Sequence, residues 1–338
     1  MGKPILLDAV YINDSGGKIL LDYLVQQLEN SNKTVFYLLD ERVENQIPMI
    51  KSGNKLVFLK SSLYDRRKFY KTNSNCFSTV LCFGNLPPNI RLSATVYTYF
   101  HQQLYINLPK DASLKLRILF YLKRKVFKYF FSNTDYWLLQ TELIKQNFVN
   151  KFNVKPSKVI ISPFYPLLPS SSYVERKRNT YVYVSNAPPH KNHLRLINAF
   201  CSFYDKHQVG KLTLTISKDF PYLLKIIEEK RKCNYPIYNI GFIKREELSN
   251  VYRESEYLIY PSTAESFGLC IVEAIENGCK VIGANLPYTY AVCKPSLTFD
   301  PLDEKSISEA LSLSLEENIN PSFAKVSNKI DELISLLK

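Results

Sequence analysis

Short apolar runs rich in β-branched residues alternate with longer stretches of helical periodicity along the chain. In the first half, helices are predicted notably over 17–30, 112–131 and 141–151. The apolar runs between and around them predict strands at 5–8, 34–39, 55–59, 79–83, 94–100, 136–140 and 159–162. Strands that alternate with helices in this way are typical of a parallel sheet built from βαβ units.

The pattern stops after the last of these strands and then restarts. Residues 163–178 contain three prolines, three consecutive serines and a basic cluster without periodicity, which is typical of a linker. Beyond it, strands are predicted at 181–184, 212–216, 237–240, 257–260 and 281–283, and helices near 190–206, 220–232, 245–254, 267–277, 303–316 and 321–337.

The chain is therefore predicted to be an α/β protein with two doubly wound, Rossmann-like domains. We expect an N-terminal domain over 1–165, a linker over 166–178 and a C-terminal domain over 179–320. A final helix within 321–338 is expected to pack back toward the N-terminal domain. In sheets of this kind, ligands bind at the carboxyl ends of the strands.

Composition narrows the class of protein. The 338 residues are 46% hydrophobic and 22% charged, which excludes a disordered, collagenous or disulfide-framework protein. Seven cysteines without a C-x-x-C pair favour reduced, buried thiols in a cytosolic protein. An acidic residue at Asp8 and the lack of a long apolar run predict neither a signal peptide nor a membrane span, so we expect a cytoplasmic location.

The positive charge is concentrated in one half of the chain. The formal net charge is +13, and residues 1–170 hold 23 basic and 11 acidic side chains against 21 and 20 in residues 171–338. Part of the excess lies on the predicted helix 115–131, where Arg117, Arg124, Lys125 and Lys128 cluster opposite an apolar face. This side is either a solvated surface or a contact with anionic lipid headgroups, which would place the protein peripherally on a membrane.

The residues with the clearest chemistry lie at 260–278. A buried strand ends at Pro261 and a helix begins near Phe267, so a helix N-terminus with Gly268 stands at a strand's carboxyl end and could hold a phosphate. Glu265 precedes this helix and Glu273 lies roughly 9–12 Å further along it. Two carboxylates at that separation suit a ligand with hydroxyl groups at both ends, such as a nucleotide sugar. The alternative is a capped helix with a solvated glutamate.

This segment resembles the E-x(7)-E element of the retaining glycosyltransferases of family four, which have the GT-B fold of two Rossmann-like domains facing across a cleft. The resemblance implies that Glu265 lies by the donor sugar and that Glu273 binds the nucleotide ribose. It further implies that the amides of Phe267, Gly268 and Leu269 hold the diphosphate. Ser266 and Cys270 stand where the family usually has glycine and proline.

A second loop, 185–193, resembles the family's basic strand-to-helix loop. A lysine at a helix start is a good diphosphate partner, and Lys191 matches the family's lysine, which neutralises the leaving group. The family's arginine falls near Ser185 or Asn186 and is missing here. His190, Arg176 or Arg178 are the candidates to replace it. The alternative for Lys191 is a solvated charge at the start of a helix, without a role in binding.

The N-terminal half contributes three further candidates. Gly16 and Gly17 follow the first strand; a bare pair of glycines is typical of a tight turn, but the equivalent family loop presses against donor phosphates and acceptor. His101 ends the strand 94–100, where it could be a structural residue. Family members place a histidine there in contact with the donor sugar, and its near-neutral pKa suits that role.

No D-x-D or H-x-x-x-H occurs, so we expect no metal and no cofactor, with a helix dipole and Lys191 in place of a cation. The resemblance implies a retaining hexosyl- or deoxyhexosyltransferase acting from a nucleotide sugar onto a glycan or polyprenyl-diphosphate-linked acceptor. Assembly of O-antigen, lipopolysaccharide or capsular polysaccharide at the inner face of the cytoplasmic membrane is the expected setting. The alternatives are a nucleic-acid-binding protein, for which no motif is visible, a sugar-nucleotide epimerase, or a relative that binds without turnover.

Overall fold

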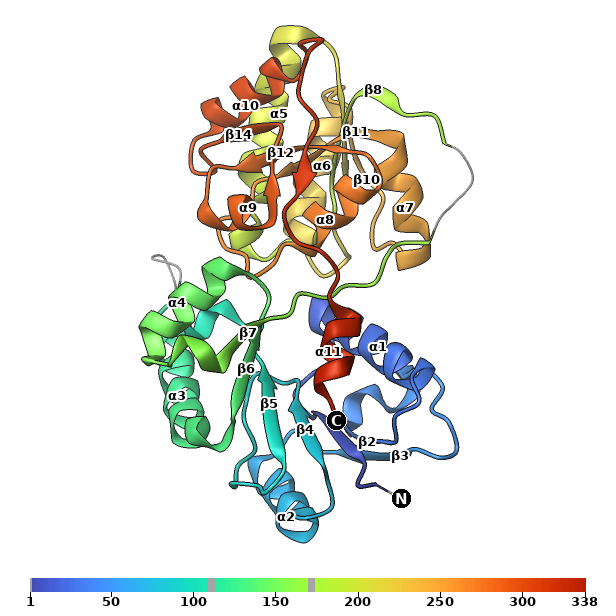
Figure 1. Cartoon of the computed structure of the whole chain (residues 1–338). Coiled ribbons are helices and arrows are strands. Elements are labelled where there is room, and N and C mark those ends of the chain that lie inside the picture. Colours follow the sequence, from blue (N-terminus) through green and yellow to red (C-terminus); the bar gives the residue numbers. More distant parts are fainter. Residues whose placement is uncertain (1, 109–112, 170–173) are drawn as a thin grey trace. The chain divides into compact units, whose positions relative to one another are not determined.

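The computed structural model describes residues 2–108, 113–169 and 174–338 (Figure 1). The chain forms two compact units, the first made of Met1–Pro166 together with Ser327–Lys338, and the second of Leu167–Val326. The C-terminal segment therefore belongs to the first unit, and Figure 1 shows its red helix α11 (Ile330–Leu336) beside the blue helix α1 (Ser15–Asn30).

The first unit is built on a parallel sheet with the strand order β3-β2-β1-β4-β5-β6-β7. Each strand is a short apolar run, and the central ones are buried along their length, as expected for strands covered on both faces. The strands are β1 (Ile5–Ala9), β2 (Val35–Asp40), β3 (Lys55–Leu59), β4 (Thr79–Cys82), β5 (Thr95–Tyr99), β6 (Tyr136–Leu139) and β7 (Val159–Ile161). The helices besides α1 and α11 are α2 (Leu63–Asn73), α3 (Leu114–Phe130) and α4 (Glu142–Phe152).

Aromatic packing fixes α3 and α4 against this sheet. Phe127 of α3 lies with its ring 6.4 Å from that of Phe148 of α4, and Phe148 lies 4.9 Å from Trp137 of β6. These side chains belong to one buried cluster at the β5–β6–β7 side of the sheet. Ser113 caps α3 and Thr141 caps α4 by accepting hydrogen bonds from backbone amides. Residue 112, where the predicted helix begins, is outside the described residues.

The second unit repeats the plan with a sheet in the order β10-β9-β8-β11-β12-β14. Its pairings are parallel, whereas β13 and β15 form a separate antiparallel pair. The strands are β8 (Lys177–Tyr183), β9 (Lys211–Leu214), β10 (Ile237–Asn239), β11 (Ser255–Tyr260), β12 (Lys280–Ala284), β13 (Cys293–Lys294), β14 (Leu297–Phe299) and β15 (Phe323–Ala324). The helices are α5 (His193–His207), α6 (Pro221–Lys232), α7 (Arg245–Glu254), α8 (Leu269–Glu276), α9 (Pro287–Val292) and α10 (Glu304–Leu313).

Several details differ from the sequence expectations. The helix expected over 321–337 is shorter, because β15 occupies its start and α11 begins only at Ile330. The expected linker over 166–178 overlaps β8, which begins at Lys177, and residues 170–173 of that linker lie outside the described residues. Among the thiols, Cys76 and Cys233 are exposed rather than buried.

No helix in the described part of the chain combines the length and the apolar character that a membrane crossing requires.

Candidate active site

The carboxyl edge of the second sheet brings two candidate residues into contact. The loops after β8 and β11 are joined where Thr263 donates its backbone N–H to the carbonyl of His190 at 2.8 Å. This junction places the ammonium of Lys191 2.5 Å from Glu265 Oε1, and both side chains are largely buried. A ligand that uses either group must therefore compete with this ion pair.

The loop that carries Lys191 is held by several contacts that the sequence did not reveal. Asn192 adopts a left-handed conformation (φ 61°) and donates from its side chain to the carbonyls of Pro261 and Pro301. The hydroxyl of Tyr183 donates to the carbonyl of Lys191 at 3.0 Å. These bonds fix the backbone around the lysine, and its ammonium is held by Glu265 and by the ring of Tyr260, whose centroid lies 5.7 Å away.

The helix after β11 begins as the sequence suggested. Gly268 lies at the N-cap of α8 with φ 72°, a conformation that glycine adopts without strain. The amide of Ile271 already donates to the carbonyl of Gly268 at 2.9 Å, so the amides of Leu269 and Cys270 are the ones at the helix start that can face an anion at this edge. Phe267 is buried and Ser266 is half-buried, which leaves the backbone as the part of Phe267 that could meet a ligand.

Glu273 lies inside α8 and is 2% exposed. Its Oε1 accepts a hydrogen bond from Arg245 Nη1 at 2.5 Å, and its Oε2 accepts one from the hydroxyl of Tyr252 at 3.3 Å. Arg245 and Tyr252 both come from α7, so this carboxylate is fully supported from the neighbouring helix. A ribose would have to share or displace the Arg245 interaction to reach Glu273.

The positions of Asn186 and His190 give less support for a role in donor binding. Asn186 is exposed, and its carbonyl accepts from the Ser185 hydroxyl at 2.7 Å. His190 is half-buried, and burial together with the charge of Lys191 lowers its pKa. It is neutral at pH 7 and therefore replaces the missing arginine only as a hydrogen-bonding group.

Arg176 and Arg178 are not suitable replacements for the missing arginine. Arg176 precedes β8 and donates to the carbonyl of Asn277 at 2.7 Å and to the carbonyl of Ser255. Arg178 is the second residue of β8 and is exposed. Both residues are at the amino end of β8, whereas the loop with Lys191 leaves its carboxyl end.

The first unit brings Gly17 and His101 together. A Cβ built on Gly17 would lie 3.9 Å from His101 Nε2, whereas the Gly16 position is open. The backbone amides of His101 and Gln102 donate to the side-chain carbonyl of Asn85 at 2.7 and 2.9 Å. Asn85 has φ 65° and was not predicted from the sequence.

His101 is held as a neutral imidazole. Burial lowers its pKa to about 4, and its ring packs 5.3 Å from that of Phe83. A neutral histidine can donate a hydrogen bond to a hydroxyl group without adding charge.

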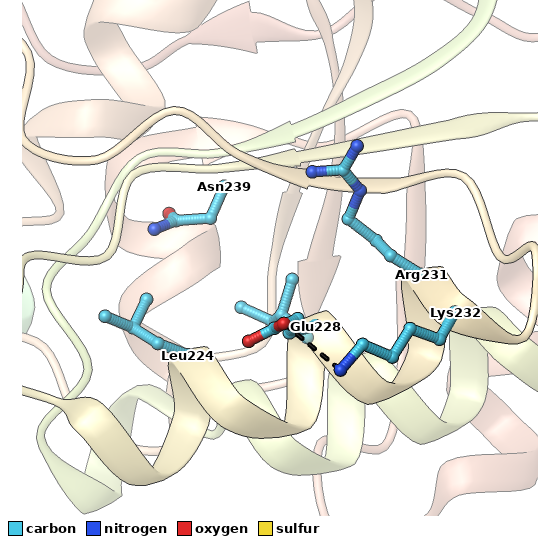
Figure 2. Close-up of a pocket in the computed structure, with 6 residues that line it drawn as sticks. Leu224, Glu228, Arg231, Lys232 and Asn239 are labelled. Atoms are coloured by element: carbon cyan, nitrogen blue, oxygen red, sulfur yellow. Dashed lines mark ion pairs between the residues drawn. The ribbon is translucent and has the colours of Figure 1, made fainter.

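One pocket of about 400 Å³ in the second unit is separate from these residues. Figure 2 shows it along α6, where Glu228 and Lys232 turn toward each other. They form an ion pair at 3.2 Å, and the side chain of Asn239 is bonded to the backbone of Ile216. Because Glu228, Lys232 and Asn239 already have partners, we do not assign a ligand to this pocket.

Among residues 2–108, 113–169 and 174–338, no group of three or more His, Cys, Asp or Glu side chains is placed to hold a metal ion.

The sequence that forms this site is similar to a known protein family. Residues 169–331 match the family described as "Glycosyl transferases group 1". This segment belongs to that family. The match contains α8 and the loops that carry Lys191 and Glu265, and it confirms the family resemblance inferred from the sequence.

The chain is also similar to curated bacterial proteins. It is 23% identical over 201 residues to the alpha-monoglucosyldiacylglycerol synthase of Acholeplasma laidlawii, covering 55% of this chain and 49% of that protein. It is 26% identical over 175 residues to the O-antigen chain mannosyltransferase RfbU of Salmonella typhimurium, covering 50% and 47%. The chain thus spans about half the length of these relatives.

Solved structures bear on the fold alone. The sucrose-phosphate synthase of Thermosynechococcus elongatus superimposes with a TM-score of 0.72 at 15% identity, covering 94% of this chain and 90% of that one. The prediction of two Rossmann-like α/β domains of the GT-B type is confirmed.

Proposed function

We propose that the protein transfers a sugar from a nucleotide-sugar donor to a glycan or lipid-linked acceptor. The observation that carries this proposal is the edge of the second sheet, where Lys191, Glu265 and the start of α8 meet. Cationic and amide donors at this edge suit a diphosphate, and Glu265 and Glu273 suit hydroxyl groups.

In the proposed reaction, the bond between the sugar's anomeric carbon and the diphosphate oxygen breaks while the acceptor oxygen bonds to that carbon. The proton of the acceptor hydroxyl goes to the departing nucleoside diphosphate, and the acceptor attacks from the same face, so the configuration is retained. Lys191 balances the charge that builds on the diphosphate. We propose that no metal is required, because Lys191 and the α8 amides supply the positive charge.

The finer setting is part of the same proposal. We infer a hexosyl- or deoxyhexosyltransferase of O-antigen, lipopolysaccharide or capsule assembly, acting at the inner face of the cytoplasmic membrane. The likeness to an O-antigen mannosyltransferase and to a glycolipid synthase supports this setting, and so does the basic first half of the chain.

Donor screening tests the proposal. The purified chain is incubated with UDP-, GDP- and dTDP-sugars and a bacterial lipid extract, and the release of nucleoside diphosphate and the glycosylated product are measured with and without EDTA. We expect one donor to support turnover, and Lys191→Ala to lower kcat by about 10²–10³. Lys206→Ala, a change at an exposed lysine of α5, is the control.

Wild-type turnover by Lys191→Ala would contradict the assigned role. A product without transferred sugar would favour an epimerase, and binding to nucleic acid at physiological salt without any donor turnover would favour the nucleic-acid alternative.

A further inference from the structure

Helix α3 has a second apolar surface that faces solvent. Leu114 is 74% exposed, Ile118 53%, Leu122 57% and Tyr129 79%. At 100° per residue these four positions lie within about 80° of one another, so they form a continuous strip along the helix. We call these four residues the outer strip.

The outer strip is not the part of α3 that packs on the sheet. The opposite side carries Phe120 and Phe127, which are buried. Phe127 packs on α4 with its ring 5.0 Å from that of Phe152. A surface helix normally has one apolar face, directed at the core, so a second one exposed to water marks an interaction surface.

The buried and exposed faces of α3 differ from those expected from its sequence. Leu119, another apolar residue of this helix, is 44% exposed. Arg124, expected on the basic side, is half-buried and donates to the carbonyls of Leu104 and Tyr105 at 2.9 and 2.8 Å. The basic side chains left at the surface instead accompany the outer strip.

Those basic residues surround the outer strip and are not balanced by acids on the helix. Lys125 lies within its arc, Lys115 and Lys128 lie on its flanks, and Lys123 lies further round; all four are exposed. The sequence of α3 contains no Asp or Glu. A partner must therefore offer an apolar layer and negative charge together.

We propose that α3 lies in the interface of an anionic lipid bilayer, with the outer strip inserted among the acyl chains and its lysines on the headgroups. A second copy of this helix is a poor partner for the strip, because it would bring like charges together. This proposal names the part of the chain that would contact the membrane in the proposed function. It rests on that function only for the location at a membrane, because insertion into the bilayer does not require catalysis.

Vesicle flotation of the full chain tests the proposal. The vesicles contain either phosphatidylcholine alone or phosphatidylcholine with 30% phosphatidylglycerol, in 0.1 M and 0.5 M NaCl. Salt at 0.5 M shortens the Debye length to about 4 Å, which weakens the lysine contribution but not the apolar one. We expect binding to the anionic vesicles that remains measurable at 0.5 M.

The strip is tested by the double change Ile118→Ser and Leu122→Ser, with Leu302→Ser, a change at a 68% exposed leucine of the second unit, as the control. The double variant should lower the partition coefficient on the order of tenfold or more, and the control should not change it. The fluorescence of Trp137, buried in the first unit, verifies that the variant is folded.

Two outcomes would overturn the proposal: equal recovery of wild type and double variant, or no wild-type binding to anionic vesicles. If the double variant instead abolishes self-association measured by sedimentation, the strip is a contact between copies and the proposal is wrong. Nucleotide binding by the wild type and by the double variant is measured in parallel. A wild type that binds vesicles but no nucleotide would count against the proposed function and leave membrane insertion standing.

Discussion

At the scale of single residues, both carboxylates of the candidate donor site are already paired with cations. Glu265 is bonded to Lys191, eight residues beyond β8, and Glu273 to Arg245, at the start of α7. The motif spacing identified the two glutamates and the lysine as candidates. It could not identify Arg245, because a partner 28 positions away is brought near only by the packing of α7 on α8.

Two histidines with lowered pKa values allow a test at this scale. Burial, with the nearby charge of Lys191, lowers the pKa of His193 to about 3, and burial lowers that of His101 to about 4. NMR titration from pH 7 to 5 should therefore leave both rings uncharged. A midpoint near 6.5 for either ring would show that it is not buried as described.

The same shifts set a dependence of stability on pH. An unfolded histidine takes up a proton as pH falls through about 6.5, whereas the native rings do not until about pH 4 or below. The free energy of unfolding should therefore fall as pH is lowered from 7 toward 4. A His193→Gln variant should show a weaker fall, measured by urea unfolding at pH 7 and pH 5.

At the scale of elements, the apolar runs predicted the central strands well because parallel strands are buried on both faces. Helix α2 was not predicted, because polar residues form its buried side. Arg66 lies 2.7 Å from Asp8 Oδ2, and the hydroxyl of Tyr70 donates to the same carboxylate. Polar groups that bury one another in this way leave no hydrophobic period in the sequence.

The start of α8 is the element whose geometry matters most for the site. Gly268 has φ 72°, and a Cβ there would lie 3.1 Å from Ile271 Cδ1. Gly268→Ala should cost about 1–2 kcal/mol in the free energy of unfolding of the second unit and weaken nucleotide binding. Calorimetry and nucleotide titration measure the two effects.

Gly53→Ala is the matched control, because a Cβ at Gly53 meets no atom within 4 Å. Equal melting temperatures and equal nucleotide affinities for the two variants would show that the turn does not need a glycine.

At the scale of the whole molecule, the chain leaves the first unit at Pro166 and returns to it at Ser327. The sequence predicted two domains and a C-terminal helix. The sequence could not predict where the chain returns to the first unit, because β15 and α11 both carry apolar residues. Packing determines which unit each of them joins.

The return segment should contribute to the stability of the first unit. Leu333 of α11 is fully buried, and Asn328 donates to the hydroxyl of Tyr23 on α1 at 2.9 Å. Leu333→Ala should lower the free energy of unfolding of the first unit by about 2–5 kcal/mol. Trp137, the only tryptophan of the chain, reports on that unit in denaturant titrations.

Glu332→Ala, at an exposed position of the same helix, should leave the transition in place. An unchanged transition for Leu333→Ala would show that α11 does not stabilise the first unit.

The central claim is that the carboxyl edge of the second sheet binds the nucleotide of a sugar donor. The most direct test is calorimetric titration of the preferred nucleoside diphosphate into the wild type, Glu273→Ala, and the exposed-site control Glu309→Ala. We predict that Glu273→Ala raises Kd at least about tenfold, since a hydrogen bond to a charged group contributes about 1.5–3 kcal/mol, while the control binds like the wild type. Wild-type affinity in Glu273→Ala would contradict the claim.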